Sequence, residues 1–262
     1  MGRNTKMSHE TSEALEGLQP QAAQEIEVGR VLSLLAEGEM ETHGLLPWSS
    51  NYSFLVTVGD ASLQCLAVYK PCGGERPLWD FPQGTLCLRE YAAYLVSEAL
   101  GWSFVPPTVL REGPHGIGSV QLFIDAEPEA HYFTFRDEHV SELKRIAIFD
   151  CLVNNADRKS GHCLRGKDGR IWAVDHGVTF HTDPKLRTVI WDFHRQPIPE
   201  DILQDLSAFR DHLSRRGPLL EILSKLLAAE EIAALRRRLE ALLRTAIFPE
   251  PGSGRSTPWP PI

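Results

Sequence analysis

The stretch "NNADRKSGHCL", residues 154–164, contains the residues on which the fold assignment depends. It places Asp157 and Arg158 just after a mostly apolar segment, residues 142–155, whose pattern predicts a buried helix. Such an Asp-Arg pair can be an ordinary ion pair at a helix end, or it can begin a phosphoryl-transfer loop. The rest of the chain has to decide between these two interpretations.

Composition and charge limit the classes of function. The chain has 262 residues, 42% of them hydrophobic, and a formal net charge of -8. This acidic balance argues against nucleic-acid partners and anionic membranes, which need a basic surface. The five cysteines form no CxxC pair and no apolar signal segment opens the chain, so we expect reduced thiols and a cytoplasmic protein. No stretch is long and apolar enough for stable membrane insertion.

Hydrophobic periodicity predicts strands and helices in a definite order. The predicted elements are a helical pattern over 28–40 that stops at Gly38, a strand pair over 52–71, a helix over 85–102, a strand pair over 103–127, the helix over 142–155, a hairpin over 163–180 and helices over 199–245. We therefore expect an α+β fold of the two-lobed, protein-kinase-like kind, with an antiparallel-sheet N-lobe and a mostly helical C-lobe. The expected boundaries are a flexible leader over 1–20, an N-terminal helix and ATP-binding N-lobe over 21–125, a helical catalytic C-lobe over 126–248 and a disordered tail over 249–262.

Four residues occur in the order that kinase-type phosphoryl transfer requires. Lys70 closes a predicted strand, where it is either an exposed strand-end lysine or a contact to phosphates. Glu90 lies on the next helix, and we favour it over Glu98 as the partner of Lys70. Asp175 follows an apolar strand, where a carboxylate is costly unless it is paired or bound to metal. It stands 18 residues after Asp157, enough for a hairpin that brings both carboxylates into one cleft.

The opening stretch supplies the remaining candidates. Asp157 would be the catalytic base or the group that orients the acceptor hydroxyl. Arg158 is assigned with it to the catalytic loop, where it would brace the loop or balance its charge. His162 stands five residues after Asp157, where protein kinases have a metal-binding Asn. It is either a second metal ligand, which would favour Mn²⁺ over Mg²⁺, or a structural loop histidine, and the sequence leaves both open.

These motifs together resemble those of a known superfamily. The segments that carry the resemblance are "AVYKP" (67–71), "REYAAYLVSEALGWSFVPPTV" (89–109), "GSVQLFID" (118–125), the opening stretch and "WAVDHGVTF" (172–180). Over residues 40–195 the chain resembles the phosphatidylinositol 3-/4-kinase superfamily, nearest to the type II phosphatidylinositol 4-kinases. It is still more similar to a mainly actinobacterial family that is distantly related to them. Those lipid kinases have Asn at the position of His162.

The resemblance implies a role for each matched residue. It implies that Lys70 contacts the ATP phosphates, that Asp157 is the catalytic-loop aspartate and that Asp175 is the metal aspartate. It also implies that the backbone at Phe123, Ile124 and Asp125 receives adenine, and that the turn Ser49-Ser50-Asn51 is a serine-bearing phosphate loop.

The expected function is ATP-dependent phosphoryl transfer with Mg²⁺ or Mn²⁺ to a hydroxyl of an unknown acceptor. A protein or small molecule is favoured over a lipid, because the cysteine-rich and basic membrane-binding features of the lipid kinases are missing. One alternative is a nucleotide-binding regulatory pseudokinase with little turnover, and another is a protein nucleotidyltransferase. All three use the same cleft.

Overall fold

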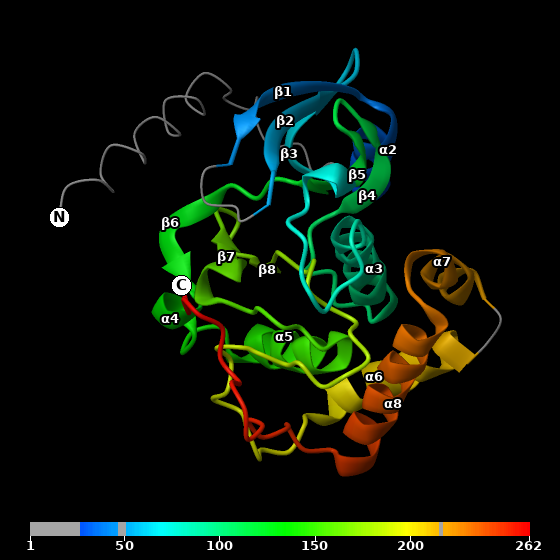
Figure 1. Ribbon diagram of the computed structural model, residues 1–262. Coiled ribbons are helices and arrows are strands. Elements are labelled where there is room, and N and C mark those ends of the chain that lie inside the picture. The colour runs from blue at the N-terminus through cyan, green and yellow to red at the C-terminus, as the bar shows by residue number, and fades with distance from the viewer. Residues whose placement is uncertain (1–26, 47–50, 215–216) are drawn as a thin grey trace.

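The computed structural model describes residues 27–46, 51–214 and 217–262 and shows two lobes (Figure 1). An antiparallel sheet forms the N-lobe, and helices with a small second sheet form the C-lobe. The predicted α+β, two-lobed architecture is therefore confirmed. The leader predicted over residues 1–20 lies outside the described residues.

The N-lobe is a five-stranded antiparallel sheet in the order β1-β2-β3-β5-β4. Alternate residues of β2 and β3 face helix α2, because successive side chains of a strand point to opposite faces. Val56 and Tyr69 are completely buried in this way, against Leu34 and Leu35 of the helix. The elements are α2 (Val28–Glu37), β1 (Glu39–Leu45), β2 (Phe54–Gly59), β3 (Gln64–Pro71), the 3₁₀ turn η1 (Cys72–Gly74), β4 (Thr108–Gly113) and β5 (Gly116–Leu122).

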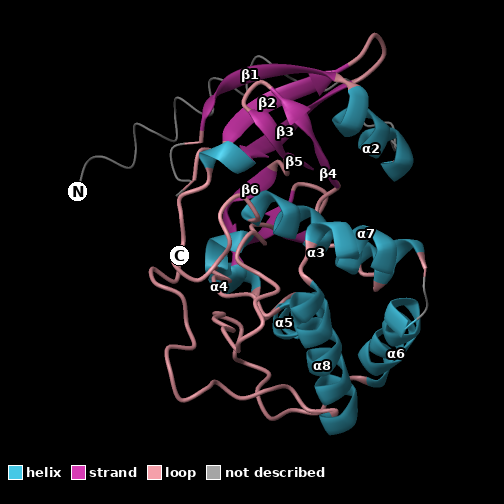
Figure 2. Ribbon diagram, turned by 45° about the vertical axis from the view of Figure 1, so that its right-hand side comes forward, coloured by secondary structure: helices cyan, strands magenta, loops and turns pink. Residues whose placement is uncertain are grey.

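Helix α3 (Leu86–Ala99) lies between the sheet and the C-lobe helices, as both ribbon views show (Figures 1 and 2). It follows the N-lobe strands in sequence, but its apolar side chains belong to the large core of the C-lobe. Ala92, Ala93 and Val96 are fully buried there, whereas the sheet and α2 form a separate small core. The helix is thus anchored to the C-lobe while it carries Glu90 toward the sheet.

The C-lobe packs helices around α5, which is buried along most of its length. A three-stranded sheet in the order β6-β7-β8 lies at the boundary between the lobes. Its elements are β6 (Ala126–His131), α4 (Tyr132–Phe135), α5 (Val140–Val153), the 3₁₀ turn η2 (Ser160–His162), β7 (Cys163–Gly166), β8 (Ile171–Ala173), α6 (Glu200–Ser214), α7 (Pro218–Leu226) and α8 (Ala229–Thr245). Of the helices in the described part of the chain, none has the length and apolar character needed to cross a bilayer.

Residues 249–262, predicted to be a disordered tail, instead lie along the C-lobe. The Thr188 amide donates a hydrogen bond of 3.0 Å to the Ser256 carbonyl, and the Ser160 amide donates one of 2.9 Å to the Pro261 carbonyl. Pro258 is buried. A composition rich in Pro, Gly and Ser does not prevent order here, because amides of the C-lobe pair with the carbonyls of the tail.

Candidate active site

Lys70 lies at the centre of the candidate site and contacts two carboxylates. Its Nζ lies 2.5 Å from Glu90 Oε1 on α3 and 3.0 Å from Asp175 Oδ1. Glu90 is buried, and its second oxygen accepts a hydrogen bond of 3.0 Å from the His176 amide. Burial by itself would lower the pKa of Lys70, but Asp175 and Glu90 together raise it, so the amine stays charged. The structure selects Glu90, not Glu98, as the partner of the lysine.

Asp175 connects Lys70 to the loop that carries Asp157. It follows β8 with a φ of 61°, a left-handed conformation that costs a non-glycine residue about 1–3 kcal/mol. Its Oδ1 pairs with Lys70, and its Oδ2 lies 3.3 Å from His162 Nε2. The charge of Lys70 holds the pKa of Asp175 far below its usual range, against the opposing effect of its partial burial. This carboxylate is therefore ionised at neutral pH and available to a cation.

Asp157 has an environment suited to accepting a proton. Its backbone N–H donates a hydrogen bond of 2.9 Å to Asn155 Oδ1, which holds the start of the loop in place. Burial raises the pKa of its carboxyl group; Lys159, whose Nζ lies 3.3 Å from Oδ2, opposes this rise and Asp175 adds to it. A carboxylate with a raised pKa holds a proton more readily, as a general base must.

Arg158 is fully buried, so it does not belong with Asp157 among the catalytic residues and instead has the loop-bracing role that the sequence also predicted for it. Its Nε and Nη2 lie 2.9 and 3.1 Å from the two carboxylate oxygens of Asp150. Its Nη1 donates hydrogen bonds to the carbonyls of Val174, at 2.7 Å, and His162, at 3.2 Å. Because protein groups surround the guanidinium, it cannot contact a substrate. It is a positioning residue that joins the catalytic loop to the segment entering Asp175.

The two histidines near Asp175 differ in what they face. His162 directs Nε2 to Asp175, and its Nδ1 lies 3.4 Å from the Lys159 amide. Burial lowers the pKa of His162 to about 4, so its ring is neutral at physiological pH. His176 is buried, with Nε2 2.6 Å from Arg158 Nη2, so its side chain points away from the cleft. Of the two, only His162 has a nitrogen close to the carboxylate that would hold a metal.

Between the lobes, the described backbone of Ile124 has an amide and a carbonyl that form no backbone hydrogen bond. The Phe123 amide donates a hydrogen bond of 2.9 Å to the Leu66 carbonyl, and the Asp125 carbonyl accepts one of 3.2 Å from the Lys167 amide. Among the described residues, neither the amide nor the carbonyl of Ile124 has a backbone partner. Of the three residues predicted to receive adenine, Ile124 therefore offers both a free donor and a free acceptor.

The predicted phosphate loop can be followed only at its end. Ser49 and Ser50 lie outside the described residues. Asn51 is described, and its Oδ1 accepts a hydrogen bond of 2.9 Å from the Arg76 amide. This contact fastens the turn before β2 to the loop that follows η1, so the Asn51 oxygen is already engaged.

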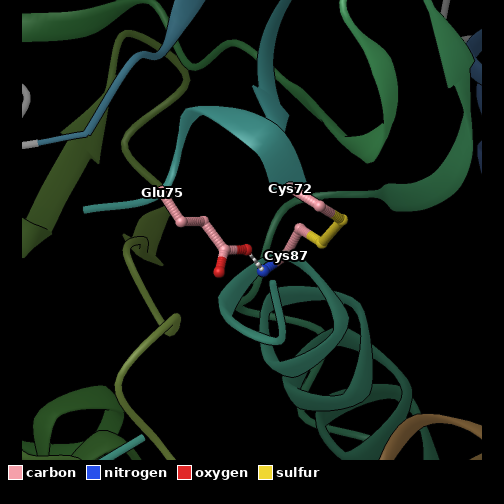
Figure 3. Close-up of side chains that lie close together, drawn as sticks. All are labelled: Cys72, Glu75 and Cys87. Carbon is pink, nitrogen blue, oxygen red and sulfur yellow. Dashed lines mark hydrogen bonds between the residues drawn. A yellow bond between two sulfur atoms is a disulfide. The ribbon is translucent and has the colours of Figure 1, made fainter. Parts of the chain in front are cut away.

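Two of the five cysteines contradict the expectation of reduced thiols. Cys72 and Cys87 form a disulfide with their Cα atoms 5.7 Å apart, whereas Cys65, Cys151 and Cys163 are free. Figure 3 shows the bond joining η1 to the first turn of α3. Spacing alone could not reveal this pair, because the two cysteines stand fifteen positions apart in the sequence and only the fold brings them together.

Several residues that position the site were not assigned from the sequence. Asn155 donates a hydrogen bond of 2.9 Å to Asp150 Oδ1, and Asp150 in turn holds Arg158. Asn154, in a left-handed conformation at the end of α5, donates to the carbonyls of His181 and Asp183 at 2.9 and 2.7 Å. The signal for Asp150 was present, because a lone aspartate in an apolar helix needs a buried partner.

Comparison with known proteins identifies the family. The family model described as "Phosphatidylinositol 3- and 4-kinase" matches residues 110–212, which include Asp157 and Asp175. Protein Rv2133c of Mycobacterium tuberculosis is 44% identical over 265 residues, an alignment that covers 87% of this chain and 94% of that protein. The chain belongs to the family of Protein Rv2133c. This family is distantly similar to the phosphatidylinositol 3- and 4-kinases, as the sequence motifs predicted.

Solved structures show that the chain has a kinase fold. The crystal structure of the Golgi casein kinase matches with a TM-score of 0.56 and 18% identity, covering 85% of this chain and 74% of that one. The same kinase with Mn/ADP bound matches with a TM-score of 0.51 and 18% identity, covering 83% and 74%. At this identity the likeness is one of fold, and it agrees with the two lobes seen here.

Proposed function

We propose that the protein is an ATP-dependent phosphotransferase that uses Mg²⁺ or Mn²⁺ and acts on a hydroxyl of a protein or small molecule. The observation that carries the proposal is the contact of Lys70 with both Glu90 and Asp175. This arrangement places one cation from the sheet, one helix carboxylate and one exposed carboxylate together, as a kinase needs them. The Mn/ADP bound to the structurally similar Golgi casein kinase supports the choice of ligands.

The donor atoms present fit a divalent cation. Asp175 Oδ2 and His162 Nε2 lie 3.3 Å apart, and two atoms that bind one ion at about 2.1 Å each are separated by about 3 Å. Half of the Asp175 side chain is exposed, so an ion can reach it. A bound divalent ion would supply neutralisation of the charge that develops on the phosphates.

The chain itself would do the positioning and the proton transfer. Lys70 would exchange part of its contact with Asp175 for phosphate oxygens, while Glu90 keeps its amine in place. Asp157 would orient the acceptor hydroxyl and accept its proton, for which its raised pKa is suited. The neighbouring Lys159 would balance negative charge beside that carboxylate.

The choice of acceptor rests on charge. The chain carries a formal net charge of -8, and a surface of this sign is not attracted to anionic lipids. A hydroxyl on a protein or small molecule is therefore favoured over a phosphoinositide headgroup.

Isotope transfer distinguishes the proposed reaction from its alternatives. Incubation with cell extract and γ-labelled ATP is expected to label an acceptor, whereas α-labelled ATP should label none. Lys70→Met serves as the control, since it keeps the apolar stem but loses the charge that holds phosphates. Label from the α position would show nucleotidyl transfer instead. Binding of ATP without any transfer would support a regulatory protein.

Substitution of His162 tests its proposed role as a metal ligand. In the wild type we expect Mn²⁺ to support nucleotide binding better than Mg²⁺, because an imidazole nitrogen suits Mn²⁺ better. His162→Asn should shift the preference toward Mg²⁺, which prefers oxygen ligands. Calorimetric titration with each metal measures this, and His212→Asn on the exposed face of α6 is the control. An unchanged preference would mean that His162 is a structural loop residue.

A further inference from the structure

The Cys72–Cys87 disulfide joins the two elements that supply the central ion pair. Cys72 follows Lys70 by two residues, at the end of β3. Cys87 precedes Glu90 by three residues, so both lie on one side of α3 about one turn apart. A short covalent path therefore runs from the lysine to the glutamate through the two sulfur atoms, whose bond is drawn in Figure 3.

The disulfide matters for packing because the strand end that carries Lys70 and the helix that carries Glu90 belong to different hydrophobic cores. Tyr69, beside Lys70 on β3, is buried in the small core of the N-lobe. The apolar residues of α3 are buried in the large core of the C-lobe. Helix α3 also packs against β4 and β5 of the sheet, but those contacts are made to strands other than β3, whose end carries Lys70. The disulfide is a covalent bond placed at the junction of that strand end with α3.

A third side chain belongs to the same junction. Glu75 Oε1 accepts a hydrogen bond of 2.8 Å from the Cys87 amide, in the first turn of α3 (Figure 3). Glu75 Oε2 is buried and has no hydrogen-bond partner among the described residues. The loop that Glu75 begins reaches the C-lobe, where Asp80 pairs with Lys185 at 2.8 Å. The disulfide thus also fixes the point at which the loop from Glu75 to Asp80 leaves the N-lobe.

We infer that the Cys72–Cys87 disulfide is a positioning bond of the nucleotide site, and that opening it by a thiol weakens nucleotide binding by loosening the Lys70–Glu90 pair. This inference rests on the proposed function, because it assigns a means of regulation to the same site. The bond takes no part in the chemistry of phosphoryl transfer; it acts through Lys70 and Glu90.

The opening reaction is thiol–disulfide exchange. A thiolate of a dithiol attacks the sulfur of Cys72, which is partly exposed, whereas Cys87 is buried. The bond between the two protein sulfurs breaks, and Cys87 leaves as a thiolate that then takes a proton. The second thiol of the reductant displaces Cys72 and closes the reductant into a disulfide. The protein gains two electrons and two protons, which the dithiol loses.

Other contacts keep α3 folded after reduction. Arg89, next to Glu90, pairs with Glu231 of α8 at 2.6 Å and donates a hydrogen bond of 2.7 Å to the Thr179 carbonyl. The His176 amide still holds Glu90. Reduction should therefore free the end of β3 and the first turn of α3, while the helix remains packed on the C-lobe.

The first measurement is calorimetric titration of Mn-ADP into oxidised protein and into protein reduced with dithiothreitol and exchanged, without air, into reductant-free buffer. We expect affinity to fall about tenfold on reduction, within the usual range of coupling between sites. A protein carrying both Cys72→Ser and Cys87→Ser should bind Mn-ADP as weakly as the reduced wild type does, and its affinity should not change when reductant is added. Cys65→Ser and Cys151→Ser, which leave the disulfide intact, should respond as the wild type does.

The second measurement does not depend on nucleotide. The rate at which an acylating reagent modifies Lys70, followed by mass spectrometry, should rise on reduction, because an amine paired with Glu90 is poorly reactive. Faster labelling without nucleotide binding in either form would overturn the proposed function but keep the positioning role of the bond. Unchanged Lys70 labelling in protein shown by mass to be reduced would overturn the inference, whatever happens to affinity. Circular dichroism checks that the reduced protein is folded.

Discussion

Asp157→Asn is expected to lower phosphoryl transfer by about 10²-fold or more while leaving nucleotide affinity almost unchanged. The scale is that of removing a positioned acid–base group. The amide keeps the shape of the side chain but can no longer take the acceptor proton. The substitution removes the ion pair between Asp157 and Lys159, whose atoms lie 3.3 Å apart in the wild type. The Lys70–Glu90 pair, which would bind the nucleotide, keeps its contact. Single-turnover transfer of γ-label and calorimetric titration of Mn-ADP measure the two effects separately.

Two further variants make this result specific. Asp137→Asn removes an exposed carboxylate away from the cleft and should leave both quantities unchanged. Asp175→Asn should weaken metal-dependent nucleotide binding, because the charge that would hold the ion is lost. Normal turnover in the Asp157 variant would exclude the proposed base, and equal loss of affinity in both aspartate variants would show that their roles are not distinct.

The order of the elements could be predicted because local sequence encodes it. The strand pair β2–β3 alternates apolar residues around Gly59-Asp60, and α3 and α5 repeat them at helical spacing. Strand β1 was missed because its sequence, EMETHGL, is polar and almost all of it is exposed. A solvated edge strand carries no hydrophobic signal, and its partner β2 is what defines it.

The site could be predicted in part for a similar reason. Lys70, Asp157 and Asp175 were recognisable because each polar group follows an apolar element directly. The loop-bracing role predicted for Arg158 agrees with its contacts, but its grouping with Asp157 as a catalytic residue does not, since a charged residue in a polar loop gives no sign in the sequence that it is buried. Its partner Asp150 lies eight residues earlier on α5, and only the turn after that helix brings the two together.

Arg158→Met is expected to destabilise the protein by about 3–5 kcal/mol, the usual cost of leaving one charge of a buried pair without its partner. Asp150 would keep a carboxylate that is 0% exposed, and among the described residues only the side-chain amide of Asn155 would remain as a neutral donor to it. Chemical denaturation measures the loss. The control is Arg145→Met, whose pair with Asp201 is partly exposed to solvent and should contribute at most about 1 kcal/mol.

Combining Arg158→Met with Asp150→Leu separates stability from positioning. Replacing a buried ion pair by apolar residues of similar size is often close to neutral, so much of the lost stability should return. Turnover should stay low, because the hydrogen bonds from Arg158 to the carbonyls of Val174 and His162 are still missing. Those bonds hold the loop of Asp157 against the segment that enters Asp175, and misplacing such groups by about 1 Å can cost about 10²-fold in rate. If the double variant regained wild-type turnover together with its stability, Arg158 would serve only to neutralise Asp150, and its positioning role would have to be abandoned.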